Sequence, residues 1–145
     1  SNTPTLHTTH ISNALTDLSG GAYDYRGDGY YGKYGFREED IITYYEERGI
    51  TPQGSYIDDF LSNRTRQDDA VSWAIGHYEP QYRDVGVEIT SRKSKVTSRL
   101  YNTTLRTVTL MNALRFGIDA QLSPTQLIQS NQTLLNYRSS LNGGN

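Results

Sequence analysis

The chain contains no cysteine, which excludes disulfide bonds, thiolate catalysis and cysteine-ligated zinc. It is also poor in hydrophobic residues, which make up 34% of its 145 positions, against roughly 45–50% in an average globular domain. No apolar run approaches the roughly 20 residues of a membrane-spanning helix, and no basic region followed by an apolar stretch opens the sequence. We therefore expect a thin hydrophobic core, no stable membrane span and no conventional signal peptide.

Charge is segregated along the chain, although the formal net charge is only −2. Residues 37–69 hold nine acidic and four basic side chains, whereas residues 83–115 hold seven basic and two acidic ones. This segregation favours pairing between segments or between chains, and nucleic-acid binding is the rival interpretation of the basic segment. Because Thr, Ser and Leu dilute the basic residues and the whole chain is acidic, we expect no nucleic-acid partner.

Tyrosine and glycine are abundant, with 12 and 13 residues respectively. Residues 21–36, GAYDYRGDGYYGKYGF, hold five of each. A glycine inside a helix costs about 1 kcal/mol relative to alanine, so this stretch should not form regular helix. We expect residues 1–36 to be a flexible arm whose rings become ordered on a partner's surface. Its candidate interaction residues are Tyr25, Arg26, Asp28, Tyr30, Tyr31 and Tyr34.

The same stretch contains three short motifs, and two of them fail at particular positions. Asp24, Asp28 and Gly29 match a calcium loop, but Arg26 occupies a ligand position and Gly35 replaces the bidentate glutamate. A G-x-G-x-x-G spacing lacks the preceding apolar strand that a dinucleotide site requires. The remaining motif, the tripeptide Arg-Gly-Asp, leaves an adhesive function open.

Catalytic and metal-binding groups do not form a recognisable set. The carboxylates of a glycosidase face each other across a cleft, whereas the acidic residues here are neighbours in sequence within polar surroundings. The three histidines do not provide the convergent ligands of a zinc site. We expect no enzymatic activity, no cofactor and no metal site. The acidic pairs considered are Glu38-Glu39, Glu46-Glu47, Asp58-Asp59 and Asp68-Asp69.

Several short helices are expected after the arm. Residues 37–48 carry three acids in the first turn, where the helix dipole favours them, and Gly49 follows at the C-cap position. A turn then leads to a short element over residues 56–61. We expect NRTRQDD to be a loop, with Asp68 or Asp69 capping the next helix.

The C-terminal half predicts one long helix over about residues 84–120 and a terminal helix over about residues 123–141, which begins with a capping box. Gly117 and Pro124 favour a fold-back into a hairpin over one continuous rod. Polar residues in the seam indicate pairing that is weaker than in an ideal coiled coil. The apolar contact residues expected here are Val96, Leu100, Leu105, Val108, Met111, Leu114, Ile118, Leu127 and Leu134.

Together these patterns predict a mainly α, elongated protein. Residues 1–36 would be the flexible arm, and residues 37–145 a single helical domain with a short irregular or small α/β insert. The long C-terminal helix would form a helical hairpin or a coiled coil.

The stretch EEDIITYYEERGITPQGSYIDDFL, residues 38–61, resembles a segment of the EspA/SseB-like proteins of bacterial type III secretion systems. The shared pattern combines an acidic helix start, an aliphatic-aromatic helix, a Gly-Ile pair, a turn with glycine and Ile-Asp-Asp-aromatic. The residues that carry it are Glu39, Asp40, Ile41, Ile42, Tyr44, Gly49, Ile50, Gly54, Ile57, Asp58, Asp59 and Phe60.

The resemblance implies a secreted filament or needle-tip protein at the bacterial cell surface. It would self-associate, bind needle or translocator subunits, be held by a dedicated chaperone before export and carry no catalytic residues. The family's apolar N-terminal pairing helix is replaced here by the Gly/Tyr stretch, and Pro124 interrupts the C-terminal helix. An Arg-Gly-Asp adhesion module and a bacteriophage virion assembly protein are the alternatives.

Overall fold

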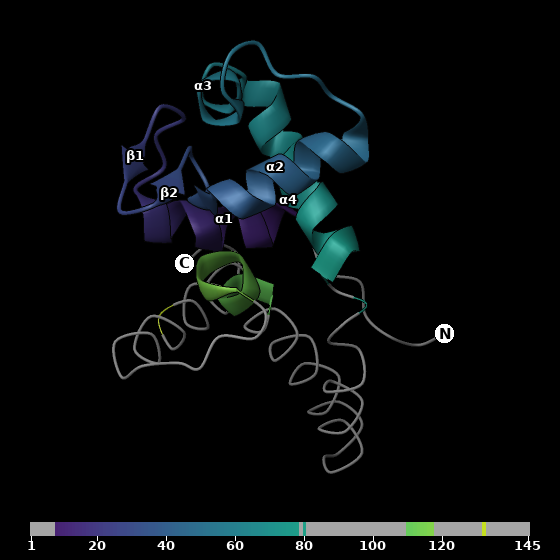
Figure 1. Ribbon diagram of the computed structural model, residues 1–145. Coiled ribbons are helices and arrows are strands. Elements are labelled where there is room, and N and C mark those ends of the chain that lie inside the picture. The colour runs from purple at the N-terminus through teal and green to yellow at the C-terminus, as the bar shows by residue number, and fades with distance from the viewer. Residues whose placement is uncertain (1–7, 79, 81–109, 118–131, 133–145) are drawn as a thin grey trace.

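The structure, a computed structural model, describes residues 8–78, 80, 110–117 and 132. This part of the chain forms a small α/β domain in which a three-stranded antiparallel sheet lies at one edge, beside the helices (Figure 1). Residues 110–116 add a further helical segment. The other elements are α1 (Thr8–Ser19), β1 (Arg26–Gly27), β2 (Tyr30–Tyr31), β3 (Phe36–Arg37), α2 (Glu38–Arg48), α3 (Tyr56–Leu61) and α4 (Arg64–Tyr78).

The Gly/Tyr stretch forms the sheet, so the predicted flexible arm is wrong for residues 21–36. The strands are ordered β1-β2-β3, and Gly27 pairs with Tyr30 across a two-residue turn. The turn residues Asp28 and Gly29 have φ angles of 56° and 83°. Positive φ at both central positions is what a type I′ hairpin turn requires, and Asp-Gly is a preferred sequence for it. The glycines therefore define tight turns.

Local sequence signals correctly predicted α2, and the short element expected over residues 56–61 is the helix α3. The acids of α2 lie in its first turn, and Gly49 ends the helix in the left-handed conformation. In α3, the hydroxyl of Ser55 caps the backbone N–H of Asp58 at 3.0 Å. The prediction for α4 was wrong at its start, because the helix begins at Arg64 inside the expected loop.

Aromatic rings form the centre of the core, where α2, α3 and α4 meet. Tyr44 makes edge-on contacts with Tyr45, Phe60 and Trp73 at centroid distances of 5.6–6.4 Å. Phe36 of β3 contacts Phe60 at 5.8 Å and joins the sheet to this cluster. Large rings bury much apolar area per residue, which lets a chain of low hydrophobic content build a core.

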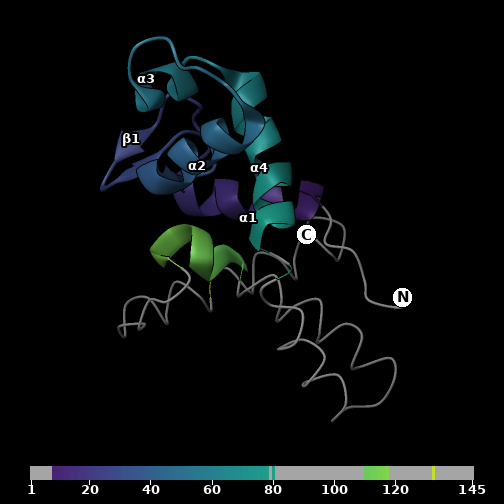
Figure 2. The same ribbon diagram turned by 45° about the vertical axis from the view of Figure 1, so that its right-hand side comes forward.

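The helical segment 110–116 completes the core against α1, and both views show the two lying side by side (Figures 1 and 2). Met111 and Leu114 are at most 2% exposed, and Ile11 and Leu15 of α1 are buried in the same cluster. The core therefore combines side chains from both sides of the predicted boundary at residue 36.

The predicted mainly α, elongated fold is wrong, because the described chain is a small α/β domain. The long helix does not reach residue 120: the helical segment ends at residue 116, and Gly117 has a φ of 93°, outside the helical region. Residues 84–109 and the predicted terminal helix over 123–141 lie outside the described residues, apart from Gln132.

Gly32 lies against the buried Gln67, whose side chain is 0% exposed. Gln67 Oε1 accepts from the backbone N–H of Lys33 at 2.8 Å, and its Nε2 donates to the carbonyls of Tyr23 and Phe60 at 2.9 and 3.0 Å. This amide therefore satisfies backbone groups of the sheet region and of α3 from within α4.

Gly32→Ala should destabilise the protein by about 3 kcal/mol, because the new Cβ would collide with the Gln67 amide and disrupt its hydrogen bonds. Gly54→Ala is the matched control: Gly54 also has positive φ, 78°, but has no heavy atom within 4 Å of an added Cβ. It should cost only about 1 kcal/mol. Urea unfolding of both variants measures the difference in the free energy of unfolding. Equal losses of stability would contradict the conclusion that the Gln67 hydrogen bonds need the space left by Gly32.

Candidate interaction site

Hydrogen bonds from tyrosine hydroxyls to aspartate carboxylates recur throughout the domain. Each joins segments that are separated in sequence by 14 to 45 residues. A hydrogen bond to an ionised acceptor is about twice as strong as a neutral one. Burial, followed by the bond to the carboxylate, raises the pKa values of Tyr34, Tyr44 and Tyr45, so these hydroxyls remain donors. The pairs are Tyr23 and Tyr34 with Asp68, Tyr44 with Asp69, Tyr45 with Asp59, and Tyr78 with Asp40.

Asp59 is the buried acceptor in α3, with 7% of its surface exposed. It accepts from the hydroxyl of Tyr45, from the guanidinium of Arg66 and, at 3.1 Å, from the backbone N–H of Gln53. Burial alone would raise the pKa of Asp59, but these three donors outweigh it and lower the pKa. The carboxylate therefore links α2, the 52–54 turn and α4 in its ionised form.

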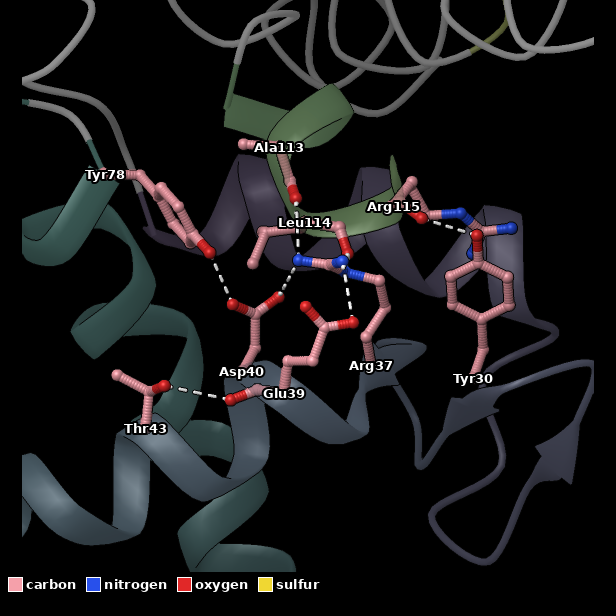
Figure 3. A network of polar contacts seen from close by, with 9 residues as sticks. All are labelled: Tyr30, Arg37, Glu39, Asp40, Thr43, Tyr78, Ala113, Leu114 and Arg115. Atoms are coloured by element: carbon pink, nitrogen blue, oxygen red, sulfur yellow. Dashed lines mark hydrogen bonds and ion pairs between the residues drawn. The ribbon is translucent and has the colours of Figure 1, made fainter. Parts of the chain in front are cut away.

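A second network holds the end of the helical segment 110–116 (Figure 3). Arg37 Nε donates to the carbonyl of Leu114 at 3.1 Å, and its Nη2 lies 3.3 Å from Asp40 Oδ2. Asp40, 3% exposed, also accepts from the Tyr78 hydroxyl. Burial raises the pKa of Asp40, and the contacts with Tyr78 and Arg37 oppose that shift. Arg37 therefore supplies, from β3, the cap that this distant helix end needs.

The Arg-Gly-Asp tripeptide lies at the tip of the β1-β2 hairpin. The Arg26 guanidinium donates to Asp58 at 2.7 Å, and both side chains are more than half exposed. This contact and the Ser55 hydroxyl lower the pKa of Asp58. Asp28 is exposed in the turn. Of the two charged residues of the motif, Arg26 thus forms an ion pair and Asp28 forms part of the hairpin turn.

The remaining predicted interaction residues are more buried than expected. Tyr34 is 5% exposed, and Tyr25, Tyr30 and Tyr31 are half-buried. Met111 and Leu114, two of the predicted apolar contact residues, are buried in the core of their own domain. The other predicted contact residues lie outside the described residues: Val96, Leu100, Leu105, Val108, Ile118, Leu127 and Leu134.

Sequence reasoning missed Arg37, Gln67 and Arg115. Gln67 had no local signal, because its partners are backbone groups of distant segments. Arg37 precedes α2, and its position in the sequence indicated only that a helix begins there, not that its side chain reaches residue 114. Arg115 stacks its guanidinium on the ring of Tyr30, 4.1 Å from the ring centroid, and the Tyr30 hydroxyl donates to the Arg115 carbonyl (Figure 3).

These arrangements make the buried carboxylates structural. Asp40 and Asp59 each contact a phenol and a guanidinium, which leaves them withdrawn from solvent and already hydrogen-bonded. Over the residues that the structure describes, no three His, Asp or Glu side chains converge as a metal site would require. Nor does any helix in these ranges combine the length and the apolar character needed to cross a bilayer.

No protein-family model, curated protein or solved structure matches this chain.

Arg37→Met should destabilise the protein by about 3 kcal/mol, because it removes the helix cap and leaves the buried Asp40 without its cation. Arg48→Met is the matched control, since Arg48 also pairs with an aspartate, Asp69, at 3.2 Å, but both side chains are exposed. Its loss should be below about 1 kcal/mol. Guanidinium chloride unfolding distinguishes the two, and a loss for Arg37→Met no larger than the control's would contradict the capping role.

The network around Asp59 predicts a particular pH dependence. Its folded-state pKa is below the unfolded value of about 3.9, so its contribution is fully present above about pH 4 and is lost as the pH falls through the folded pKa. The stability gap between wild type and Asp59→Asn should be about 2–4 kcal/mol at pH 7 and should narrow at acidic pH. Urea unfolding from pH 7 to pH 3 measures this gap, and a constant gap would refute ionisation as its source.

Proposed function

We propose that the protein is a non-catalytic structural and interaction component of a bacterial secretion apparatus, acting outside the cell in a needle-associated assembly. The proposal includes self-association, binding to needle or translocator subunits, and a chaperone that holds the protein before export. The secretion role is supported by the resemblance of residues 38–61 to type III secretion proteins. Those residues form α2, its glycine-capped end and α3.

The non-catalytic part rests on the way the buried carboxylates are used. Each accepts a hydrogen bond from a tyrosine hydroxyl of a distant segment, an interaction that we call a tyrosine tie. A general acid or base must reach the proton that it transfers. Asp40 and Asp59 are at most 7% exposed, and phenol and guanidinium donors already contact both carboxylates. Their geometry suits a rigid scaffold better than an acid/base pair.

The ordered sheet also changes how binding would occur. A flexible arm loses conformational entropy when it binds, whereas a preformed hairpin has already lost it during folding. A partner would therefore meet a fixed surface formed by β1, β2 and their turn.

The Arg-Gly-Asp adhesion function is the second candidate, and the exposed turn at Asp28 favours it. The ion pair between Arg26 and Asp58 weighs against it, because a receptor would have to compete for the guanidinium. Water screens an exposed pair of this kind, so a receptor could displace it, but the guanidinium is already engaged and we therefore rank adhesion second.

Export tests the proposed function directly. The epitope-tagged full-length protein should appear in the culture supernatant of a bacterium with an active type III apparatus. It should remain cell-associated in an isogenic strain without the export ATPase. A cytosolic marker protein controls for lysis.

Equal amounts in both supernatants, or none in either while a known exported protein appears normally, would refute the secretion role. Light scattering of the purified chain from about 1 to 100 μM adds a second measurement. A strictly monomeric mass that needle subunits leave unchanged would contradict the assembly role.

A further inference from the structure

Arg115 differs from the other described arginines in its charge environment. Arg26, Arg37, Arg48 and Arg66 each form an ion pair with a carboxylate. A fifth, Arg64, is exposed to water and lies over the ring of Tyr23. Within the described part of the chain, Arg115 is thus the arginine that is partly buried without a carboxylate partner.

Part of the Arg115 guanidinium is also left unsatisfied. Its Nε is buried without any hydrogen-bond partner. An unpaired buried donor is costly, and more so when the group is charged. Contact with the Tyr30 ring and the position near a helix C-terminus both favour the positive charge. Neither supplies an anion, and none of the described carboxylates pairs with Arg115.

The surroundings hold the guanidinium in place. Tyr30 keeps its ring under Arg115 through the bond from its hydroxyl to the Arg115 carbonyl. Gly35 leaves the space for the side chain, because an added Cβ would lie 3.1 Å from Arg115 Nη1. Arg115 as a whole is only partly buried, and of its guanidinium nitrogens Nε is the one that is buried without a partner.

Tyr25 provides a second polar group near this charge. Its hydroxyl makes no hydrogen bond to the described residues and lies beside Gly27, where an added Cβ would be 2.7 Å away. Gly27 pairs with Tyr30 across the hairpin, so the Tyr25 hydroxyl lies on the same hairpin as the ring that contacts the guanidinium. Burial lowers the pKa of Arg115, and the phenols of Tyr30 and Tyr25 oppose that shift.

We propose that Arg115, Tyr25 and Tyr30, the Arg115 site, bind a carboxylate of a partner protein. The Arg115 Nη groups hold its two oxygens, the Tyr25 hydroxyl donates to it and the Tyr30 ring supports the guanidinium. Arginine binds planar carboxylates through paired N–H groups, and the bound carboxylate would neutralise a charge that no described carboxylate pairs with. This inference rests on the proposed interaction role and adds the chemistry of the partner.

Titration with N-acetylglutamate, followed by ¹⁵N-edited NMR on the full chain at constant ionic strength, tests the site. The backbone amides of Tyr25 and Tyr30 should shift saturably, with a dissociation constant on the order of 1–10 mM. Neutral N-acetylglutaminamide, in which both carboxylates are replaced by amides, should give no saturable shift. Inorganic phosphate is the third probe, and saturable binding of phosphate without binding of the carboxylate would overturn the proposal.

Variants assign the binding to particular groups. Arg115→Met should abolish the saturable shift, and Arg64→Met should leave it unchanged, although it also removes an arginine that lies over a tyrosine ring. Tyr25→Phe should weaken binding about three- to tenfold, because it removes one hydrogen-bond donor. Equal binding in Arg115→Met and Arg64→Met would overturn the site.

If Arg115→Met does not fold, Arg115→Lys provides the same comparison. It keeps the charge but loses the planar fork, and should bind at least about tenfold more weakly. Binding as tight as that of wild type would contradict the assignment. The titration requires no export, so a failed carboxylate site and a failed secretion role give separate results.

Discussion

Hydrogen bonds from phenols to carboxylates are the interaction on which this domain depends. In a chain with few aliphatic residues, tyrosine contributes both a large apolar ring and a donor that can reach across the core. Each tie satisfies two polar groups that would otherwise be costly to bury. Asp40 and Asp59 can lie in the interior because Tyr78 and Tyr45, together with Arg37 and Arg66, supply the donors that ionised carboxylates need.

The ties also determine how the sheet is positioned. Tyr23 and Tyr34, which flank the hairpin, both donate to Asp68 of α4, and Gln67 beside it satisfies backbone groups from the same region. The glycines allow this close approach, most clearly at Gly32. A segment whose composition suggests disorder is therefore fixed by a helix that begins about 30 residues later.

Sequence patterns predicted the elements that depend on neighbouring residues. The acids of α2 and the glycine after it act within one turn of helix, so their effect can be inferred locally. The sheet was missed although Asp28-Gly29 is a recognised hairpin sequence, because the glycine content was taken as evidence for flexibility. The tyrosine–aspartate hydrogen bonds, the long-range bonds of Gln67 and the Arg115 site depend on contacts across 14 to 85 residues, which no local pattern specifies. The tyrosines of the stretch were expected to order on a partner, whereas Tyr34 is buried in its own domain and Tyr25, Tyr30 and Tyr31 are half-buried there.

Backbone dynamics measure the central claim most directly. If the ties order the Gly/Tyr stretch, ¹⁵N relaxation of the free protein should give residues 23–36 order parameters near 0.85, like those of α2 and α4. Values below about 0.6 across these residues, alongside rigid helices, would show that the stretch is a mobile arm after all and would contradict the role of the tyrosine ties.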